Sequence, residues 1–402
     1  MEAVETRKTV KGQLAEIKDL SELMVDLAYA AVFFSDLDLA REVGRLEEQM
    51  HGDLHDVRKL AILAARSPED AEHMVGVLAI SSAIERISDA AADIARVAGP
   101  PRGALESLIK DLRYADEIVS RLKVAEGSAA AHRTLRDLAL PVELGVWVIA
   151  TRQEGRWRLD PDPDQVLYPN LTILVRGPED GVNEARQLMG VPRLLATPEP
   201  PQTALTDLDR AVDLLVEMKN SAEVAVGLAY SALLFNDKAL ATEVAHLEER
   251  SDTLHHELES WVLRSSRDTE NPDDLRGLLH LANASEMIFD SAREMTRLVE
   301  QGEELHPVIA AALVESDEVG HETVVASGSA ADTRSIKDLA IESETGMFIL
   351  AVQRGRRWIY RPKPSTILGP GDRLIAIGPP QGGEELDRLV GMVLDPAELG
   401  ET

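Results

Sequence analysis

The sequence predicts an α+β protein that contains one unit twice, each unit being a three-helix bundle followed by a small α+β domain. Residues 27–48 and 228–249 lie 201 positions apart and are identical at 13 of 22 positions. A repeat near half the length of 402 residues indicates a duplicated module rather than a solenoid of short repeats. Helical spacing of apolar residues opens each unit, and short apolar runs between Gly and Pro close it.

The bundles follow from helix periodicity and helix start signals. Apolar residues predict a first helix from Leu14 to about Phe34, and Ser35-Asp36 is a break that supplies N-cap residues. A second helix is expected to about Ala65. Ser67-Pro68 then opens a third, which ends near Gly99. Short connections predict antiparallel packing. The second unit repeats the pattern at 204–235, 237–265 and 272–301, the last opening at Asn271-Pro272.

A further helix is expected in each unit, at 104–122 and 305–316. Strands are then predicted at 346–352, 358–360 and 373–378, with a hairpin at Arg354–Arg357 and a closing helix at 383–392. The first unit has the corresponding runs at 145–150, around Trp157 and at 171–177. We therefore expect domains at 1–100, 101–195, 196–302 and 303–402, packed as an intramolecular pseudo-dimer, with a homodimer as a further option.

Composition limits the classes of partner. A net charge of -29 argues against a nucleic-acid-binding face, which needs basic residues. Lys accounts for only ten of the 42 basic residues, and an acidic, Lys-poor chain fits a halophilic host. The chain has no Cys, its N-terminal residues have no apolar signal core, and no apolar run is long enough to span a bilayer. We expect a cytoplasmic protein without direct membrane insertion.

The α+β units resemble the TrkA C-terminal domain, also called RCK C. The resemblance rests on Arg334-Ser-Ile-Lys-Asp-Leu339, on the strand that ends in Ala351-Val-Gln-Arg-Gly355, and on Leu368-Gly-Pro-Gly-Asp-Arg-Leu-Ile-Ala-Ile-Gly378. In the first unit, Pro169-Asn170 stands where a Gly-Asp turn belongs. The resemblance implies a regulatory domain of potassium channels and transporters. No GxGxxG turn follows a strand, so NAD or ATP is not the expected ligand.

The bundles resemble the PhoU domain through Leu46-Glu-Glu48 and Ile84-Glu-Arg-Ile-Ser-Asp89. Both resemblances together imply two copies of a PhoU-like bundle followed by an RCK C-like domain, as in archaeal accessories of potassium transport. The partner implied is a membrane channel, symporter or antiporter subunit for potassium or another cation, contacted from the inner face of the membrane.

Paired carboxylates in the bundles are candidate metal ligands. Glu85 and Asp89 lie four residues apart and share a helix face, where their charges repel. A bridging divalent cation would reverse that repulsion, and carboxylates suit Mg, Ca, Mn or iron. The resemblance to PhoU implies a metal role for this pattern; the alternative is a solvated or Arg-paired acidic face. The complete candidate set is Glu47, His51, Glu85, Asp89, Glu248, Asp252, Glu286 and Asp290.

Three arginines at the second hairpin are candidate ligand-binding residues. Arg354, Arg356 and Arg357 form a compact basic patch near Asp372, and Arg pairs well with phosphate oxygens. The resemblance implies cyclic di-AMP as a ligand between two RCK C domains; the alternative is a solvated hairpin tip. His255-His256 are expected at the surface, because adjacent helical residues point apart.

The sequence shows no nucleophile beside a base and no phosphate-cradling Gly loop, so we expect a protein that is not an enzyme. Two functional hypotheses remain open. The first is a ligand-sensing regulatory subunit of potassium or other monovalent cation transport. The second is a metal-binding, PhoU-like adaptor in phosphate transport signalling.

Overall fold

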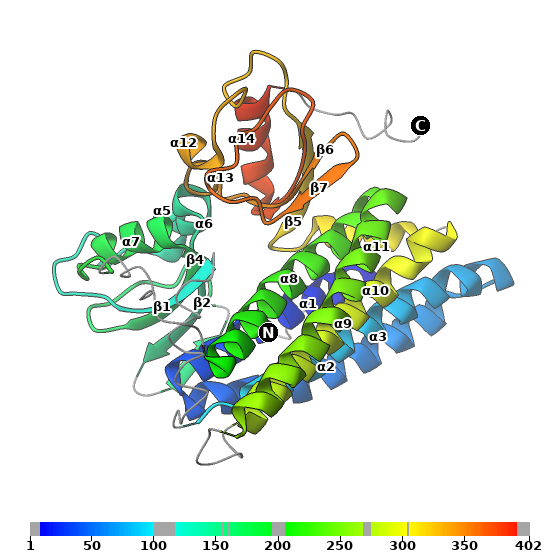
Figure 1. The fold of residues 1–402 in the computed structure, drawn as a ribbon, viewed down its shortest axis with the longest axis horizontal. Helices are drawn as coiled ribbons and strands as arrows, with labels where there is room; N and C mark the ends of the chain where they lie inside the picture. The colour runs from blue at the N-terminus through cyan, green and yellow to red at the C-terminus, as the bar shows by residue number, and fades with distance from the viewer. Residues whose placement is uncertain are drawn as a thin grey trace, which may run out of the picture.

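The computed structural model describes residues 9–99, 117–153, 156–159, 161–194, 206–267, 275–303 and 305–391. Long helices form one layer within these ranges, and two small four-stranded sheets with their own short helices lie on one side of it (Figure 1). The predicted α+β class and its internal duplication are confirmed.

The first bundle consists of α1 (Val10–Phe34), α2 (Leu37–Ala64) and α3 (Pro68–Arg96). The boundaries have local causes that the sequence indicated. Ser35 adopts a left-handed conformation with φ 51° and ends α1, and the Asp36 side chain accepts hydrogen bonds from the first N–H groups of α2. Ser67 caps α3 in the same way, with Pro68 in its first turn.

The second bundle consists of α8 (Asp207–Phe235), α9 (Lys238–Ser265) and α10 (Arg276–Gln301). Asn236 and Asp237 repeat the left-handed cap and the N-cap of the first bundle. The predicted helix opening at 271–272 lies outside the described residues. The two bundles share one apolar core, because α3 packs against α10 and the Tyr29 hydroxyl lies 3.1 Å from that of Ser285.

The strands of the two α+β domains are β1 (Glu117–Lys123), β2 (Trp147–Gln153), β3 (Arg156–Leu159), β4 (Thr172–Pro178), β5 (Val319–Val324), β6 (Phe348–Arg354), β7 (Arg357–Tyr360) and β8 (Arg373–Gly378). The first domain has an antiparallel sheet in the order β1-β4-β2-β3, and the second has the order β5-β8-β6-β7. Arg354 pairs with Arg357 across β6 and β7, so the predicted hairpin is confirmed.

The prediction of a helix over 104–122 is wrong at its end, where residues 117–123 form β1; residues 104–116 lie outside the described residues. Ile118, Ser120 and Leu122 are buried while their neighbours are more exposed, so the segment has the two-residue period of a strand. Pairing with β4 fixes this conformation. The equivalent strand β5 was also not predicted. In contrast, the helix predicted at 305–316 is confirmed as α11 (Pro307–Val314), which packs on α1 and α8.

Each sheet is buried on both faces. One face joins the core of the bundles, and the other packs on the domain's own short helices, where each domain has a separate apolar cluster. These helices are α5 (Leu135–Leu138), α6 (Leu140–Leu144), α7 (Glu179–Leu188), α12 (Ile336–Leu339), α13 (Ile341–Thr345) and α14 (Pro380–Val390).

The two α+β domains touch through α6 and α13, and the contact is reciprocal. A Cβ atom on Gly145 would lie 2.7 Å from the carbonyl oxygen of Glu342, and one on Gly346 would overlap the carbonyl oxygen of Pro141. Both glycines also have positive φ. Because the same two positions meet in both directions, an internal pseudo-twofold relates the halves. Over the described part of the chain, no helix is long and apolar enough to cross a membrane.

Candidate functional site at the domain junction

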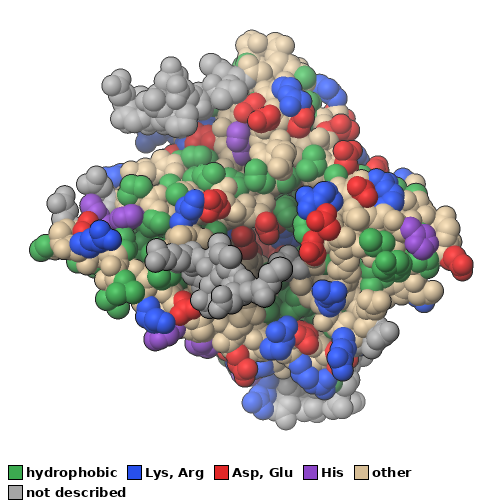
Figure 2. Space-filling view, turned by 180° about the vertical axis from the view of Figure 1, so that it is seen from behind, with side chains coloured by type: hydrophobic (Ala, Val, Ile, Leu, Met, Phe, Trp, Pro, Cys, Tyr) green, Lys and Arg blue, Asp and Glu red, His purple; other side chains and the backbone are tan. Residues whose placement is uncertain are grey.

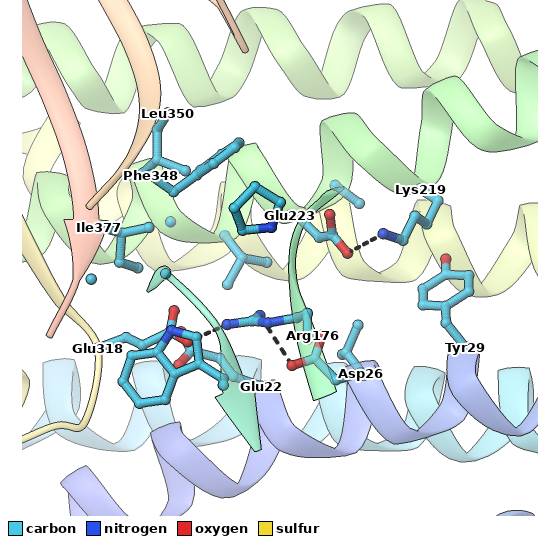
Figure 3. Close-up of a pocket in the computed structure, with 18 of the residues that line it drawn as sticks. Glu22, Asp26, Tyr29, Arg176, Lys219, Glu223, Glu318, Phe348, Leu350 and Ile377 are labelled. Atoms are coloured by element: carbon cyan, nitrogen blue, oxygen red, sulfur yellow. Dashed lines mark hydrogen bonds and ion pairs between the residues drawn. The ribbon is translucent and has the colours of Figure 1, made fainter. Parts of the chain in front are cut away.

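The pseudo-twofold passes near a cavity of about 90 Å³ that is lined by both bundles and both α+β domains (Figure 3). The long helices α1 and α8 form one wall, and Trp147 and Phe348, from equivalent positions at the start of β2 and β6, form another. Charged side chains from both bundles and both α+β domains also line this partly buried site, where a lowered dielectric constant strengthens their interactions.

Lysine and glutamate four residues apart occupy equivalent positions on α1 and α8. Lys18 Nζ lies 2.7 Å from Glu22, and Lys219 Nζ lies 2.7 Å from Glu223. Each ammonium group also lies near the ring of the opposite half's tyrosine, at 5.5 Å from the Tyr230 centroid for Lys18 and 5.6 Å from that of Tyr29 for Lys219. Burial raises the pKa of both tyrosines, so both hydroxyls stay neutral.

Arg176 belongs to the first copy only, because the equivalent position in the second copy is not an arginine. Its guanidinium lies 3.0 Å from Asp26 on α1 and also pairs with Glu318, just before β5 (Figure 3). One side chain of the first α+β domain thus contacts the first bundle and the second α+β domain. The equivalent positions of Asp26 and Arg176 in the second copy are Gly227 and Ile377, so both partners of this ion pair are absent there together.

A larger groove of about 450 Å³ adjoins the cavity and shares Glu22, Asp26, Arg176 and Glu318 with it. The groove is strongly acidic. Burial raises the pKa of Asp19 to about 6, with Lys18 lowering it and Asp317 raising it further. Burial likewise raises the pKa of Glu22 to about 8, although Lys18 opposes the shift.

Sequence reasoning missed this cluster. The signal was present, since two of the ten lysines lie at equivalent positions with a glutamate four residues later, inside helices that are otherwise mostly apolar. Arg176 carried no such signal, because it lies at the end of β4 and its partners come from α1 and from residue 318.

The predicted metal ligands in the first bundle lie close together but do not form a ligand shell. Burial raises the pKa of Asp89; His51 opposes the shift and Glu47 and Glu85 add to it, which places all three near Asp89. Arg58 pairs with Glu85, and Arg96 lies 3.2 Å from Glu47. The structure therefore favours the Arg-paired alternative at these two carboxylates.

The second bundle differs in detail. Burial raises the pKa of Glu248 and of Asp290, and in each case Asp252 raises it further, so these three carboxylates also lie near one another. His255 pairs with Glu286 and its side chain is only 13% exposed, so the expectation of a surface His255 is wrong. Among the described residues, no three His, Asp or Glu side chains form a group that could hold a metal ion. Metal binding stays a prediction.

The predicted ligand-binding residues of the second α+β domain divide into two kinds. Arg354 donates two hydrogen bonds to Asp372, at 2.8 and 2.6 Å, and Asp372 is 2% exposed and also accepts from the N–H of Gly369. Asp372 thus has a structural role and is not available to a ligand. Arg356 and Arg357 are exposed at the hairpin. In the first domain, Asn170 adopts the left-handed conformation of Gly371, with φ 72° against 84°, so the turn itself is retained.

Comparison with known proteins assigns families to the four domains. The PhoU domain model matches residues 14–98 and 215–299, and the TrkA-C domain model matches residues 119–190 and 321–391. A stretch of 59 residues is 39% identical to "Potassium channel protein 1" of Methanocaldococcus jannaschii. That stretch is 15% of this chain and 18% of the relative's length.

Solved structures give weaker likenesses. PhoU from Pseudomonas aeruginosa has 15% identity and a TM-score of 0.39, covering 72% of this chain and 93% of its own. The GsuK RCK domain has 14% identity and a TM-score of 0.18, covering 80% of this chain and 79% of its own.

Proposed function

This chain belongs to the proteins that combine PhoU and TrkA-C domains, each present here twice in tandem, and on that premise we propose that it is a non-enzymatic regulatory subunit of potassium or other monovalent cation transport. TrkA-C domains are regulatory domains of potassium channels and transporters, and the short match to a protein named as a potassium channel supports the same assignment. We place the protein at the cytoplasmic face of the membrane, bound to a channel, symporter or antiporter subunit.

The reciprocal contact of the two α+β domains is the observation that carries the proposal. Gly145 and Gly346 bring α6 and α13 into backbone contact on the pseudo-twofold. Two TrkA-C domains that meet in this way can change their relative orientation when a ligand binds. A ligand changes that orientation only if it binds one arrangement more tightly than the other.

The route from these domains to the bundles runs through the junction described above. Arg176 contacts Asp26 on α1 and Glu318 before β5, so a rotation of one α+β domain against the other must lengthen at least one of these ion pairs. The shared core between the sheets and the long helices makes the remaining contact apolar and tightly packed. Movement in the TrkA-C pair therefore reaches α1 and α8 directly.

Affinity purification from the host tests the proposal. The tagged full-length chain is recovered from solubilised membranes at high KCl, and its partners are identified by mass spectrometry. We expect a cation channel or transporter subunit. The purification is repeated with two variants, Gly346→Ala and Gly371→Ala, to test whether the partner recognises the arrangement of the two TrkA-C domains. Both glycines have positive φ, but only Gly346 lies against the other domain. Recovery of no transport subunit contradicts the proposal.

The alternative function is a PhoU-like adaptor in phosphate transport signalling. The carboxylates that gather around Asp89 and around Asp290 favour it, because their mutual repulsion would be relieved by a bound cation. The same purification distinguishes the two functions, since the adaptor would recover phosphate-importer or sensor-kinase subunits in place of a cation transporter.

A further inference from the structure

The junction between α1 and the entry to β5 carries more negative than positive charge. Lys18, with a side chain 3% exposed, binds Glu22, lies 3.4 Å from Asp19 and donates to the backbone oxygen of Glu318 at 2.8 Å. The N–H of Asp317 donates to Asp19 across the same contact. Within the junction, Lys18 and Arg176 face the carboxylates of Asp19, Glu22, Asp26, Asp317 and Glu318.

Other charged groups on the packed elements do not remove the imbalance. Tyr230 on α8 faces Glu22, and its neutral hydroxyl brings no positive charge. The rest of the cavity and groove adds more acids than bases, namely Glu16, Asp53, Glu223 and Glu342 against Arg45 and Lys219. Closing this interface with every carboxylate ionised would place like charges together in a partly buried site, which is unfavourable.

The second copy provides an internal comparison, because an arginine joins the equivalent lysine–glutamate pair there. Asn220 stands in place of Asp19, and its backbone oxygen accepts a hydrogen bond of 2.6 Å from Arg361. Arg361 also lies 3.4 Å from Glu223. Burial alone would raise the pKa of Glu223, but Lys219 and Arg361 lower it overall. Two equivalent glutamates thus have opposite preferences for a proton.

We propose that the contact between α1 and the start of β5 is a proton-dependent latch, in which Glu22 holds a proton while the second TrkA-C domain is docked and loses it when the domain loosens. Glu223, at the equivalent position, stays ionised and keeps the other lysine–glutamate pair closed at all pH values of interest. The latch is a property of this fold and does not depend on the transport function proposed above.

The direction of the pH effect follows from linkage. Burial and the neighbouring carboxylates raise the pKa of Glu22 to about 8 in the docked state, against an ordinary value of 4.5. The docked state therefore binds more protons than the loosened state between these values, so docking weakens as the pH rises and the loss is complete above about pH 8. Asp19, with its pKa raised to about 6, also weakens docking as it ionises, at the acidic end of the same pH range.

The absence of cysteine allows a direct measurement on the full-length chain. Spin labels on Arg41→Cys of α2 and Arg388→Cys of α14, both on exposed side chains, report the distance between the first bundle and the second TrkA-C domain. Double electron–electron resonance at fixed ionic strength from about pH 6 to about pH 9.5 should show a narrow distance distribution that broadens or shifts as the pH rises towards about pH 8 and changes no further above it.

Two substitutions complete the test. Glu22→Gln removes the group with the higher pKa and should keep the distance distribution narrow at about pH 8 and above, where the labelled parent has loosened, whereas Glu223→Gln should leave the pH-dependent change as in the labelled parent. A distribution that does not change with pH in the labelled parent overturns the latch without needing either variant to fold. A Glu22→Gln protein that still loosens near the same pH also overturns it.

Discussion

The guanidinium of Arg121 on β1 donates a hydrogen bond of 2.8 Å to the carboxylate of Asp36, the N-cap residue of α2. The first α+β domain is thereby fixed to the turn between α1 and α2. The second domain reaches the equivalent turn from a neighbouring strand, since Arg373 on β8 pairs with Asp237, the N-cap residue of α9. Glu322 occupies the position equivalent to Arg121 and binds Arg373 instead. Both copies keep the arginine-to-cap contact although the arginine has moved.

Arg373→Met is expected to lower the free energy of unfolding by about 3 kcal/mol, because it leaves the buried carboxylate of Glu322 without its partner. Arg121→Met should cost less, about 1–2 kcal/mol, since Arg121 is 32% exposed and Asp36 still accepts from two backbone N–H groups. Urea unfolding measures both. Arg388→Met is the control, because its pair with Glu385 is exposed and is worth at most about 1 kcal/mol. Equal costs for all three would contradict the docking role.

Gly346→Ala should destabilise the protein by about 2–4 kcal/mol, because the new Cβ overlaps the carbonyl oxygen of Pro141 and the residue keeps a positive φ of 70°. Gly371→Ala separates the two causes. Its φ is 84° but the space around it is open, so only the conformational cost of about 1 kcal/mol applies. Thermal unfolding provides the comparison. If the two variants were equally stable, the contact between the TrkA-C domains would not be as close as the structure has it.

The sequence was sufficient for elements whose patterns are local. The caps at Ser35-Asp36 and Ser67-Pro68, and the hairpin at Arg354–Arg357, are determined by residues within a few positions, and each is found where it was predicted. Strand β1 could not be predicted in this way, because a helix was expected to continue through residues whose alternating burial depends on pairing with β4.

The candidate site was less accessible to sequence reasoning for the same physical reason. Arg176, Asp26 and Glu318 are separated by more than a hundred residues along the chain and meet only after the four domains pack. Pattern reading instead selected acids and arginines that are close in sequence. Two of these, Arg354 and Asp372, prove to bind one another.

Asp372→Ala is expected to destabilise the second TrkA-C domain by about 3 kcal/mol, because it removes the buried partner of Arg354 and the acceptor for the Gly369 N–H. The double substitution Arg356→Ala with Arg357→Ala should leave stability within about 0.5 kcal/mol, since both residues are exposed. If cyclic di-AMP binds at this hairpin, isothermal titration calorimetry will show weaker binding for the double variant despite its normal thermal unfolding. Undiminished binding would exclude the exposed arginines as ligand residues.

The metal hypothesis for the bundles makes a prediction that depends on Arg58. Because Arg58 pairs with Glu85, a divalent cation at the Glu85–Asp89 pair must displace that guanidinium. Arg58→Ala frees the carboxylate, so Mn²⁺ should bind about 5-fold more tightly, the equivalent of a surface ion pair worth about 1 kcal/mol. Asp89→Asn should weaken binding, because it removes one of the two proposed ligands. Electron paramagnetic resonance of free Mn²⁺ measures the affinity.

Arg45→Ala is the matched control for this experiment, because its partner Glu42 lies on α2 outside the predicted ligand set, and its removal should leave the Mn²⁺ affinity unchanged. Tighter binding with both arginine variants would mean that Mn²⁺ responds to the overall negative charge of the protein and not to a defined site. Affinity that is equal in the parent, Arg58→Ala and Asp89→Asn would refute metal binding by this pair. Glu85 would then be a structural partner of Arg58, which joins α2 to α3.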